Sequence, residues 1–351
     1  MPTPSREIAP LSRRQSESCA KLASPLWARL LADATDEIER GGPLLDLLAD
    51  WDGDIENGAL PLRVAGGLHF LALNGEAPDL AALLPSCGGQ PDPDLLWPQA
   101  GAVIAGQGER LRSFLPSPPQ TNEVARCCAL MPGMLEIARL TGLPLRPREI
   151  GSSAGLNQFW DLYDYRLGPH SWNGSAGSGL TLESRWHGNA PPLQVRPTVT
   201  SRAGCDINPL DLRHADVRLR LQAYVWPDQS RRMANLRAAM AIALANDVHV
   251  EKMRASHWVT RELAERPAGE CIVVYHSIVR QYFPEDEGRA FDEAIAAAGA
   301  EATSERPVAW LRLEQDAHLR PFELRLTLWP GGETRVLATG HPHGVSAKWF
   351  A

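Results

Sequence analysis

Strand-type and helix-type segments alternate along the C-terminal part of the chain, and this alternation restricts the fold more than any other feature. Residues 271–279 and 308–314 are short, largely apolar runs of the kind that form buried strands. Residues 145–150, before a glycine turn, are expected to form another short strand, and helical patterns lie between these segments. Strands joined through helices pair in parallel, since each helix returns the chain to the same end of the sheet. The pattern therefore predicts an α/β fold with a mostly parallel sheet.

Further strand and helix segments continue this alternation, and two consecutive strands follow it at the C-terminal end. In chain order they are a strand end at 204–212, a helix at 230–246, a strand at 248–253, and helices at 257–265 and 289–300. Residues 322–329 and 334–340 have strand character on either side of Pro-Gly-Gly-Glu, which indicates a hairpin. An antiparallel C-terminal hairpin is therefore expected beside the parallel strands.

The N-terminal third has a different character, because its apolar residues recur at helical spacing and no alternating strand is visible. Residues 115–120, Leu-Pro-Ser-Pro-Pro-Gln, favour an extended linker, since consecutive prolines end any helix before them. We expect a helical cap domain over residues 1–120 and an α/β domain over 121–351. The second domain should contain an insertion at about 166–200 with one hairpin, and Pro132 should kink or split its first helix.

The composition argues against several classes of partner. The formal net charge is −7 and no dense run of Lys or Arg occurs, so nucleic acid is not expected. No stretch approaches the roughly 18 apolar residues of a membrane span, and the N-terminal residues lack a signal-peptide core, which predicts a cytoplasmic protein without membrane contact. The six cysteines show neither a Cys-x-x-Cys pair nor zinc-finger spacing, which predicts neither disulfides nor a metal site.

Residues 149–155, Glu-Ile-Gly-Ser-Ser-Ala-Gly, lie between an expected strand and an expected helix at 156–163. Gly151 and Gly155 lack a Cβ and let a ligand approach the backbone, and a helix start offers free N–H groups to a carboxylate or phosphate. Pro147 cannot donate a ladder hydrogen bond, so the strand should be short. A strand, a glycine turn and a helix in this order predict a nucleotide-cofactor site in a Rossmann-like domain.

The spacing of this segment resembles the first motif of class I S-adenosylmethionine-dependent methyltransferases, in which glycines follow an acidic residue at every second position. Ser153 stands in place of the middle glycine. The resemblance implies a Rossmann-like, methyltransferase-type domain that binds S-adenosylmethionine. It places the cofactor against the turn and the following strand ends, at Glu149, Gly151, Ser152, Ser153, Gly155, Asn157, Asp206, Ile207, Ala255, Ser256 and His276.

Asp206 resembles the acidic residue at the end of the second strand, which accepts hydrogen bonds from both ribose hydroxyls. It lies far beyond the roughly 20 residues that separate the two motifs in the compact pattern. The carry-over therefore requires that residues 166–200 form an insertion. Alternatively, Asp206 with Asn208 and Pro209 only makes a turn, as Asx residues often do.

Transfer of a methyl group needs an aligned nucleophile and, for some substrates, a base. Tyr275 and His276, near the end of one strand, and Glu314, at the end of the next, are candidate catalytic residues, and His341 and His343 are further candidates. These residues also have a structural explanation. His276 would form hydrogen bonds beneath a loop, and Glu314 would form a structural salt bridge. The expected substrate is a small molecule, and the oligomeric state stays open.

Two other functions remain open on the same residues. A binding or scaffold protein with a degenerate cofactor turn would explain Ser153 and the lack of a recognisable catalytic tetrapeptide. A nicotinamide-dependent oxidoreductase would also use a glycine turn, although the Cβ of Ser153 would intrude where the pyrophosphate touches the backbone. The terminal hairpin fits the methyltransferase-type sheet better than an all-parallel nicotinamide-binding one.

Six segments together resemble the uncharacterised bacterial domain-of-unknown-function family 2332 across nearly the whole chain. These segments are Thr121–Arg126, Glu149–Asn157, Gly204–Leu212, Tyr224–Gln229, Val274–Val279 and His341–Gly344. The resemblance implies no reaction and no catalytic residue.

Two of these segments have both a functional and a structural interpretation. Asn122, Glu123 and Arg126 would line the junction of the domains and contact a substrate, or they form a helix cap and solvated charges. Trp226 and Asp228 would stack on and bind a ligand. The structural interpretation, which we favour, has Trp226 in a packed junction and Asp228 capping the helix at 230–246.

Overall fold

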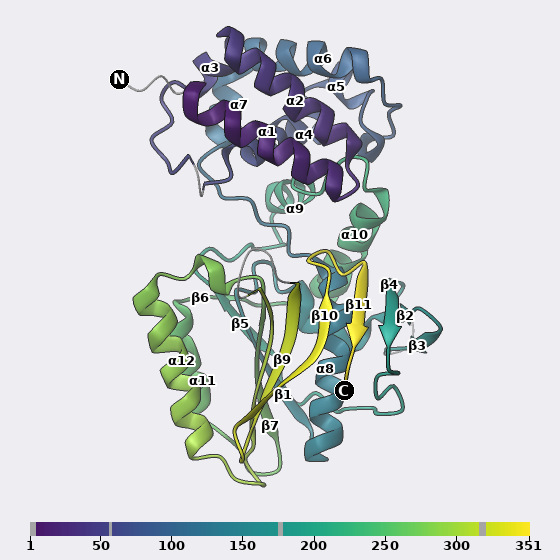
Figure 1. Cartoon of the computed structure of the whole chain (residues 1–351), viewed down its shortest axis with the longest axis vertical. Helices are drawn as coiled ribbons and strands as arrows, with labels where there is room; N and C mark the ends of the chain where they lie inside the picture. Colours follow the sequence, from purple (N-terminus) through teal and green to yellow (C-terminus); the bar gives the residue numbers. More distant parts are fainter. Residues whose placement is uncertain (1–4, 56–57, 175–177, 316–320) are drawn as a thin grey trace. The chain divides into compact units, whose positions relative to one another are not determined.

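The computed structural model describes residues 5–55, 58–174, 178–315 and 321–351 (Figure 1). The chain divides into a helical unit, residues 1–121 with 214–234, and a sheet unit, residues 122–213 with 235–351. The sequence predicts one boundary near residue 120. Residues 214–234 nevertheless belong to the helical unit, because Tyr224 and Trp226 are part of its hydrophobic core.

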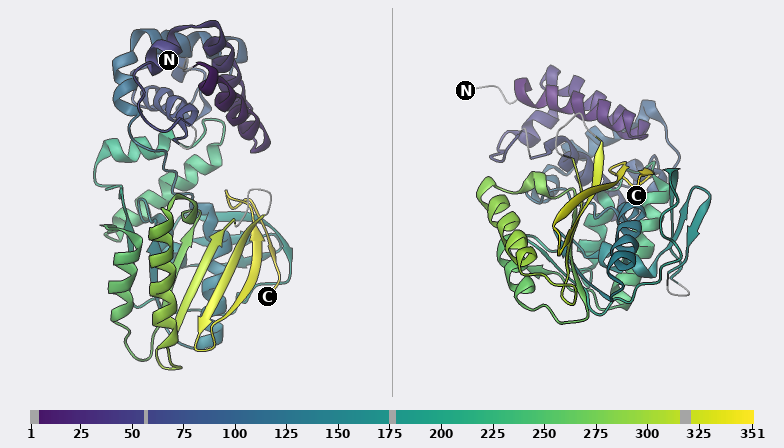
Figure 2. Two further views of the ribbon diagram at one scale, coloured as in Figure 1. Left: turned by 60° about the vertical axis from the view of Figure 1, so that its left-hand side comes forward. Right: turned by 60° about the horizontal axis from the view of Figure 1, so that its bottom comes forward.

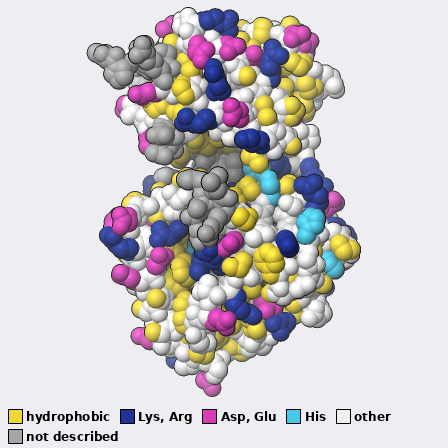
Figure 3. Space-filling view, in the orientation of Figure 1, with side chains coloured by type: hydrophobic (Ala, Val, Ile, Leu, Met, Phe, Trp, Pro, Cys, Tyr) yellow, Lys and Arg dark blue, Asp and Glu magenta, His cyan; other side chains and the backbone are white. Residues whose placement is uncertain are grey.

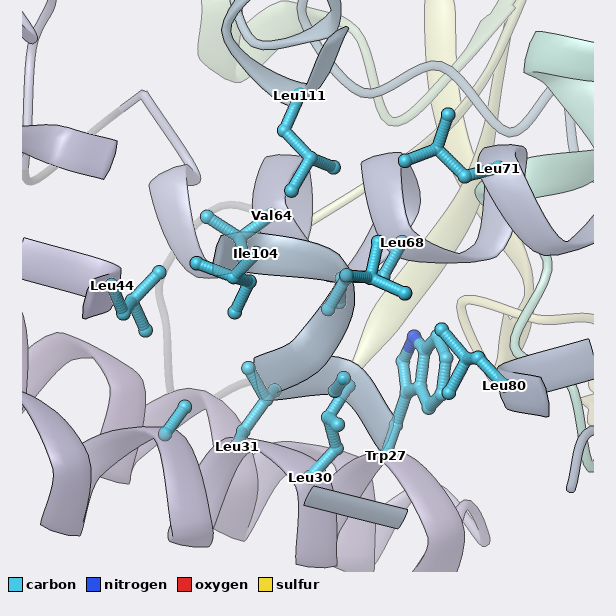
Figure 4. Packing of buried hydrophobic residues seen from close by; sticks show 14 of the residues in the cluster. Trp27, Leu30, Leu31, Leu44, Val64, Leu68, Leu71, Leu80, Ile104 and Leu111 are labelled. Carbon is cyan, nitrogen blue, oxygen red and sulfur yellow. The ribbon is translucent and has the colours of Figure 1, made fainter. Parts of the chain in front are cut away.

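The helical unit is built of short helices, several of which have proline in the first turn. Its helices are α1 (Ser5–Lys21), α2 (Pro25–Arg40), α3 (Pro43–Leu48), α4 (Leu60–Leu73), α5 (Pro78–Ala81), η1 (Pro85–Cys87), α6 (Pro93–Gly106), α7 (Gly108–Phe114), α9 (Ala215–Ala223) and the start of α10 (Ser230–Ala245). Proline suits a first turn, because its missing N–H has no intrahelical partner there. Helix α4 is buried on almost all sides, and its Leu68 lies in one apolar cluster with Trp27 of α2 and Ile104 of α6 (Figure 4).

Asp228 closes the start of α2. Its Oδ2 atom accepts the N–H of Leu26 at 2.9 Å, and its Oδ1 atom accepts the hydroxyl of Ser24 at 2.6 Å. Asp228 therefore caps a helix about 200 residues away, whereas the sequence predicts that it caps the helix that follows it. Trp226 is buried in the core of the helical unit, which agrees with its packing interpretation.

The described part of the sheet unit contains one mixed sheet of 11 strands. In spatial order they are β3 (His170–Trp172), β2 (Asp164–Leu167), β4 (Thr181–Gly188), β11 (Ser346–Trp349), β10 (Glu333–Gly340), β9 (Phe322–Trp329), β8 (Val308–Glu314), β7 (Cys271–Ser277), β1 (Leu145–Ile150), β5 (Ala203–Asp206) and β6 (Glu251–Lys252). Strands β6, β5, β1, β7 and β8 run parallel, and β9 and β10 form an antiparallel hairpin. The α/β class, the mostly parallel sheet and the terminal hairpin are confirmed.

Helices cover both faces of the parallel strands (Figure 2). Helix α8 (Cys127–Thr141), preceded by the 3₁₀ helix η2 (Val124–Arg126), packs on one face against β8 and β9. Helices α11 (Ala255–Ala264) and α12 (Glu285–Ala300) pack on the other, where Trp258 and Phe291 form a core with Ile150 of β1. The 3₁₀ helix η4 (Arg280–Tyr282) lies between β7 and α12. Because side chains alternate along a strand, Glu149, which precedes Ile150 in β1, points to the α8 face.

Residues 164–172 and 181–188 extend the sheet, whereas the sequence predicts only an insertion with one hairpin in this region. Strands β2 and β3 form that hairpin, and β4 pairs in parallel with β2 on one side and β11 on the other. The sequence does not predict β11. Four residues carry too little alternation to stand out, and the partner strand lies far away in the chain.

Several local predictions need correction. The helix expected at 156–163 is present as the 3₁₀ helix η3 (Leu156–Leu162), which is interrupted at Phe159. Pro132 lies inside α8, which continues without splitting. Pro147 lies in the central strand, where pairing with β5 begins only at Arg148, so its missing N–H falls outside that ladder. The strand expected at 248–253 is only two residues long, β6.

Charge is mixed on the face of the molecule that Figure 3 draws, where basic and acidic side chains lie among each other on each unit. None of the described helices is long and apolar enough to cross a membrane. All six cysteines are free thiols, and five of them are buried.

Candidate functional site

The predicted site residues lie at the carboxyl ends of neighbouring parallel strands. Strand β1 is central, with β5 on one side and β7 on the other. Counted along the chain, the five parallel strands lie in the order third, second, first, fourth, fifth, so the order reverses between β1 and β7. Ligands of open α/β sheets bind outside the carboxyl ends of the strands at such a reversal.

Every second residue of the turn after β1 has a left-handed backbone. Gly151, Ser153 and Gly155 have φ values of 67°, 54° and 75°. Residue 153 is therefore a serine in a conformation that glycine adopts more easily. A turn that alternates in this way directs neighbouring N–H groups into one concavity, and such concavities bind anions in many proteins.

Side-chain oxygens of the protein itself occupy the donors of this turn. The Oδ1 atom of Asn122 accepts the N–H groups of Ala154 and Leu156 at 3.2 and 3.1 Å. The Oδ2 atom of Asp206 accepts the N–H of Ser153 at 2.9 Å. The sequence predicts free N–H groups at a helix start here. The structure instead has a short 3₁₀ helix whose first amides are capped by a side chain from the segment before α8.

Apolar side chains cover the two outer glycines of the turn. A Cβ atom on Gly151 would lie 2.4 Å from Cγ2 of Val279, and one on Gly155 would lie 2.6 Å from Cγ2 of Val248. The space left by the missing Cβ atoms is therefore filled by the valine side chains. The sequence analysis expects a ligand in this space, but in the present conformation protein atoms fill it.

Asp206 lies beside the turn at 151–155, as the resemblance implies. It also makes a local turn with Asn208, which was the structural explanation of this residue. Its Oδ2 atom bonds Ser153, and its Oδ1 atom accepts the N–H of Asn208 at 2.8 Å. These two bonds use half of the roughly four acceptor positions of a carboxylate. The next residue, Ile207, has 62% of its surface exposed and offers an apolar side chain beside the carboxylate.

Glu149 is buried on the α8 face of β1, with 3% of its surface exposed. Burial raises the pKa of its carboxyl group to about 8, against hydrogen bonds with Ser152 and Asn157 that lower it. Its Oε2 atom has no hydrogen-bond partner. A buried carboxyl oxygen without a partner is costly when it is charged, which favours the protonated form of Glu149.

Tyr275 and Asn157 lie on the same side of the sheet as Glu149 and are buried beneath the turn. The hydroxyl of Tyr275 donates to the carbonyl oxygen of Asn157 at 3.3 Å, and burial raises the pKa of this hydroxyl. The Oδ1 atom of Asn157 accepts the thiol of Cys127 at 3.3 Å. Both predicted site residues therefore take part in a buried network, and neither side chain is at the surface.

His276 points to the opposite face of β7 and uses both ring nitrogens. Its Nε2 atom accepts the indole N–H of Trp310 at 3.1 Å, and its Nδ1 atom lies 2.7 Å from Oε1 of Glu314. An indole nitrogen only donates, so Nε2 is the acceptor and Nδ1 carries the proton. In this arrangement His276 and Glu314, predicted as catalytic residues, are bonded to each other.

Glu314 also binds the backbone that follows β7. Its Oε1 atom accepts the N–H groups of Val279 and Arg280 at 3.0 and 3.4 Å. Burial would raise the pKa of this carboxyl group, but the bonds from His276 and these amides outweigh burial and hold the pKa below its ordinary value. Glu314 is therefore a carboxylate that fixes a loop.

Ala255 and Ser256, predicted to hold the adenine, are the first residues of α11. The N–H and the hydroxyl of Ser256 donate to the carboxylate of Glu287 at 2.8 and 3.0 Å, and Ala255 is buried. Sequence reasoning misses Glu287. Its acidic neighbours after Pro284 indicate a helix start, but the residue that it binds could not be foreseen.

Two motifs from opposite ends of the sheet unit meet at the end of β7. The guanidinium of Arg126 donates to the carbonyl oxygens of Ser277 at 3.1 Å and Pro342 at 3.0 Å. The rings of His341 and His343 lie 5.4 Å apart, and Nδ1 of His341 accepts the N–H of His343 at 3.1 Å. Arg126 therefore joins the segments 121–126, 274–279 and 341–344, which the sequence associates only by family resemblance.

The helical unit has a cleft of its own, of about 900 Å³, between the ends of α3, α6 and α7. Arg110 and Glu76 in its lining form an ion pair of 3.1 Å. None of the predicted site residues lines this cleft. Among the residues that the structure describes, no three His, Cys, Asp or Glu side chains are placed to hold a metal ion.

The protein thus consists of a helical unit and an α/β unit. The polar motifs of the α/β unit lie at the carboxyl ends of the parallel strands of its mixed sheet. The model of the family described as "Uncharacterized protein conserved in bacteria (DUF2332)" matches residues 10–349, and the chain belongs to this family. No curated protein and no solved structure matches the chain.

Proposed function

We propose that the protein is an S-adenosylmethionine-dependent methyltransferase that binds its cofactor at the carboxyl ends of β5 and β1. The observation that carries the proposal is the pair formed by Asp206 and Ile207. A carboxylate with unused acceptor positions stands directly beside an isoleucine that is 62% exposed. Both lie at the carboxyl end of β5, one strand away from the reversal of strand order between β1 and β7, and α/β sheets bind their ligands at the carboxyl ends of strands beside such a reversal.

Asp206 and Ile207 suit the two halves of an adenosine group. The carboxylate accepts hydrogen bonds from the ribose hydroxyls, and the exposed isoleucine offers an apolar surface to the flat base. When bound, the cofactor supplies an activated methyl group. The protein then has to align the accepting atom of a small-molecule substrate with it and keep competing water away.

The closed state of the turn restricts which protein atoms take part in binding. Asn122 and Asp206 already hold the amides of Ser153, Ala154 and Leu156. In this conformation, the cofactor contacts therefore come from the side chains at the end of β5. The backbone amides serve to hold Asp206 in place.

A second candidate function is a non-catalytic binding or scaffold protein with the same fold. The engagement of His276 favours it, because both ring nitrogens bond other protein groups at 2.7 and 3.1 Å. A histidine held in this way does not act as a base on a ligand unless the surrounding segment rearranges.

Isothermal titration with S-adenosylmethionine and with S-adenosylhomocysteine tests the proposal. We expect binding of both by the wild type and a loss of roughly tenfold in affinity for Ile207→Ser, since about 1.4 kcal/mol of apolar contact is removed. Because Ile207 is exposed, this variant should keep its stability within about 0.5 kcal/mol.

Val336→Ser is the matched control, since Val336 is also an exposed apolar residue, at 40%, on β10. It should bind both compounds as the wild type does. Absence of heat with either compound, in a protein shown to be folded, rejects the methyltransferase and leaves the scaffold function.

A further inference from the structure

The segment Ser277–Arg280 runs from the last residue of β7 to the first residue of η4, and its Val279 covers the turn that holds Asp206 in place. A Cβ atom on Gly151 would lie 2.4 Å from Cγ2 and 3.0 Å from Cβ of Val279, so the valine side chain rests directly on the glycine backbone. Any ligand that reached the backbone of Gly151 would have to displace this valine. The cover is therefore built from the chain itself.

The backbone of Ser277–Arg280, which we call the cover, is strained at Ile278, directly after the end of β7. Ile278 has a φ of 54°, and a β-branched residue in the left-handed region is a genuine outlier. Such conformations persist only where the surroundings impose them, and they are found at ligand clamps and switches. The N–H of Ile278 donates to the carbonyl oxygen of Leu313 at 3.0 Å, which ties the strained residue to the neighbouring strand.

Hydrogen bonds of Glu314, His276 and Trp310, on the face of the sheet that α12 covers, hold the cover in its strained conformation. Oε1 of Glu314 accepts the N–H groups of Val279 and Arg280 at 3.0 and 3.4 Å. His276 orients the carboxylate at 2.7 Å, and Trp310 orients His276 at 3.1 Å. One partly buried carboxylate thus receives three donors, two of which belong to the cover.

We propose that Ser277–Arg280 is a movable cover over the Gly151 turn, and that Glu314 and His276 are positioning residues that latch it closed. Opening breaks the bonds to Glu314, relieves the left-handed backbone of Ile278 and uncovers Gly151. The nature of the ligand that enters rests on the proposed function. The movement of the cover does not.

Two variants should move the cover in opposite directions. Glu314→Gln keeps the shape of the side chain but removes its charge, and bonds to a charged acceptor are roughly twice as strong as neutral ones. Ile278→Asn relieves the strain of the closed form, because asparagine tolerates left-handed backbone. The first variant should favour the open cover and the second the closed cover.

Hydrogen exchange of the amides at 278–280, measured on the full chain, reports the opening without any ligand. We expect exchange about fivefold faster in Glu314→Gln and about fivefold slower in Ile278→Asn. Glu323→Gln is the control, since Glu323 lies opposite Glu314 in the β8–β9 ladder and pairs with Arg325. It should exchange as the wild type does.

Association of S-adenosylhomocysteine, followed by stopped-flow fluorescence, then tests whether the cover controls access. Faster association in Glu314→Gln and slower association in Ile278→Asn support the proposal, because a merely structural role would not shift the rate both ways. Exchange that is unchanged in both variants, or changed in the same direction, overturns the cover. Changed exchange with equal association rates overturns its control of access. If no form of the protein binds S-adenosylhomocysteine, the proposed function fails, and the exchange rates alone decide whether the cover exists.

Discussion

The helical unit and the sheet unit bury different kinds of side chain. In the described part of the helical unit, Arg63 is the only buried residue with a formal charge, and it donates to the carbonyl oxygens of Leu115 and Pro116 at 2.7 and 3.0 Å. The described part of the sheet unit buries five such residues, Glu123, Glu136, Arg148, Glu149 and Glu287. One unit is held together by apolar packing, while the other also keeps charged groups away from water.

A buried charged group destabilises a fold unless it is paired with another group. The buried charged residues of the sheet unit therefore have either a structural partner or a functional role. Glu287 binds the start of α11, and Arg148 donates to Glu262 at 2.6 Å, so these residues are structural. Glu149 is the exception, because its Oε2 atom lacks a partner. It lies beneath the turn at the carboxyl end of the central strand, which directs functional interest to that edge.

The pH dependence of stability should separate the two units most strongly. Folding raises the pKa of Glu149 from 4.5 to about 8, so between these values the folded chain keeps a proton that the unfolded chain has lost. Stability therefore falls as the pH rises through this window. The loss is roughly 5 kcal/mol, since each pH unit contributes about 1.4 kcal/mol. Urea denaturation at several pH values within the window measures it.

Variants decide whether Glu149 causes this loss. Glu149→Gln carries no ionisable group at that position and should lose the dependence on pH. Glu333→Gln removes an exposed carboxylate of β10 and should keep the wild-type behaviour. Three proteins with the same pH profile would show that Glu149 ionises as an exposed carboxylate does.

Ion pairs should also differ in value between the units, although by less. Arg148 has 3% of its side chain exposed, whereas Arg13 of the helical unit, paired with Glu39 at 2.7 Å, has 60% exposed. We expect Arg148→Met to cost about 3 kcal/mol, because it leaves Oε2 of the partly buried Glu262 without its donor, so that among the described residues only Arg261 still pairs with this carboxylate. It also removes the bonds to the carbonyl oxygens of Pro147 and Ser201. Arg13→Met should cost less than about 0.5 kcal/mol. Urea denaturation at neutral pH compares the two, and equal losses would contradict the distinction.

Loss of the helix cap in the helical unit should cost less than loss of the buried ion pair of Arg148. Asp228→Ala removes the acceptor of both Leu26 N–H and Ser24 hydroxyl and should cost roughly 1 to 2 kcal/mol. Asp228→Asn should cost less than about 1 kcal/mol, since its oxygen still accepts the amide and its NH₂ group can donate to the serine. Thermal denaturation distinguishes them. A loss of ligand binding in folded Asp228→Asn would give the residue the binding role that its packing argues against.

Sequence reasoning finds the elements of the site better than their partners. The turn at 151–155 follows a strand and lies beside Asp206, as its glycines and the acidic strand end predict. The terminal hairpin is also visible in the pattern of β9 and β10. These features depend on residues that are close together in the chain, or on strand ends that a parallel sheet brings to one edge.

The partners could not be predicted, because each hydrogen bond joins residues that the chain keeps apart. Asn122 reaches Leu156, Glu314 reaches Val279, and Glu287 reaches Ser256, in each case across more than 30 residues. A carboxylate or an amide in the sequence specifies a capacity to bond. It does not specify which of several nearby amides the side chain will face.

The sequence by itself determined the alternation of strands and helices, the glycine turn and the polar residues at the strand ends, because these follow from local propensity and from the period of apolar residues. Only the tertiary structure decided which of those polar groups remain available to a ligand. Burial leaves a backbone amide no alternative to a protein acceptor. The nearest oxygen in space therefore accepts it, and here that oxygen belongs to Asn122 or Asp206 for two amides of the turn and for the amide of Leu156 that follows it.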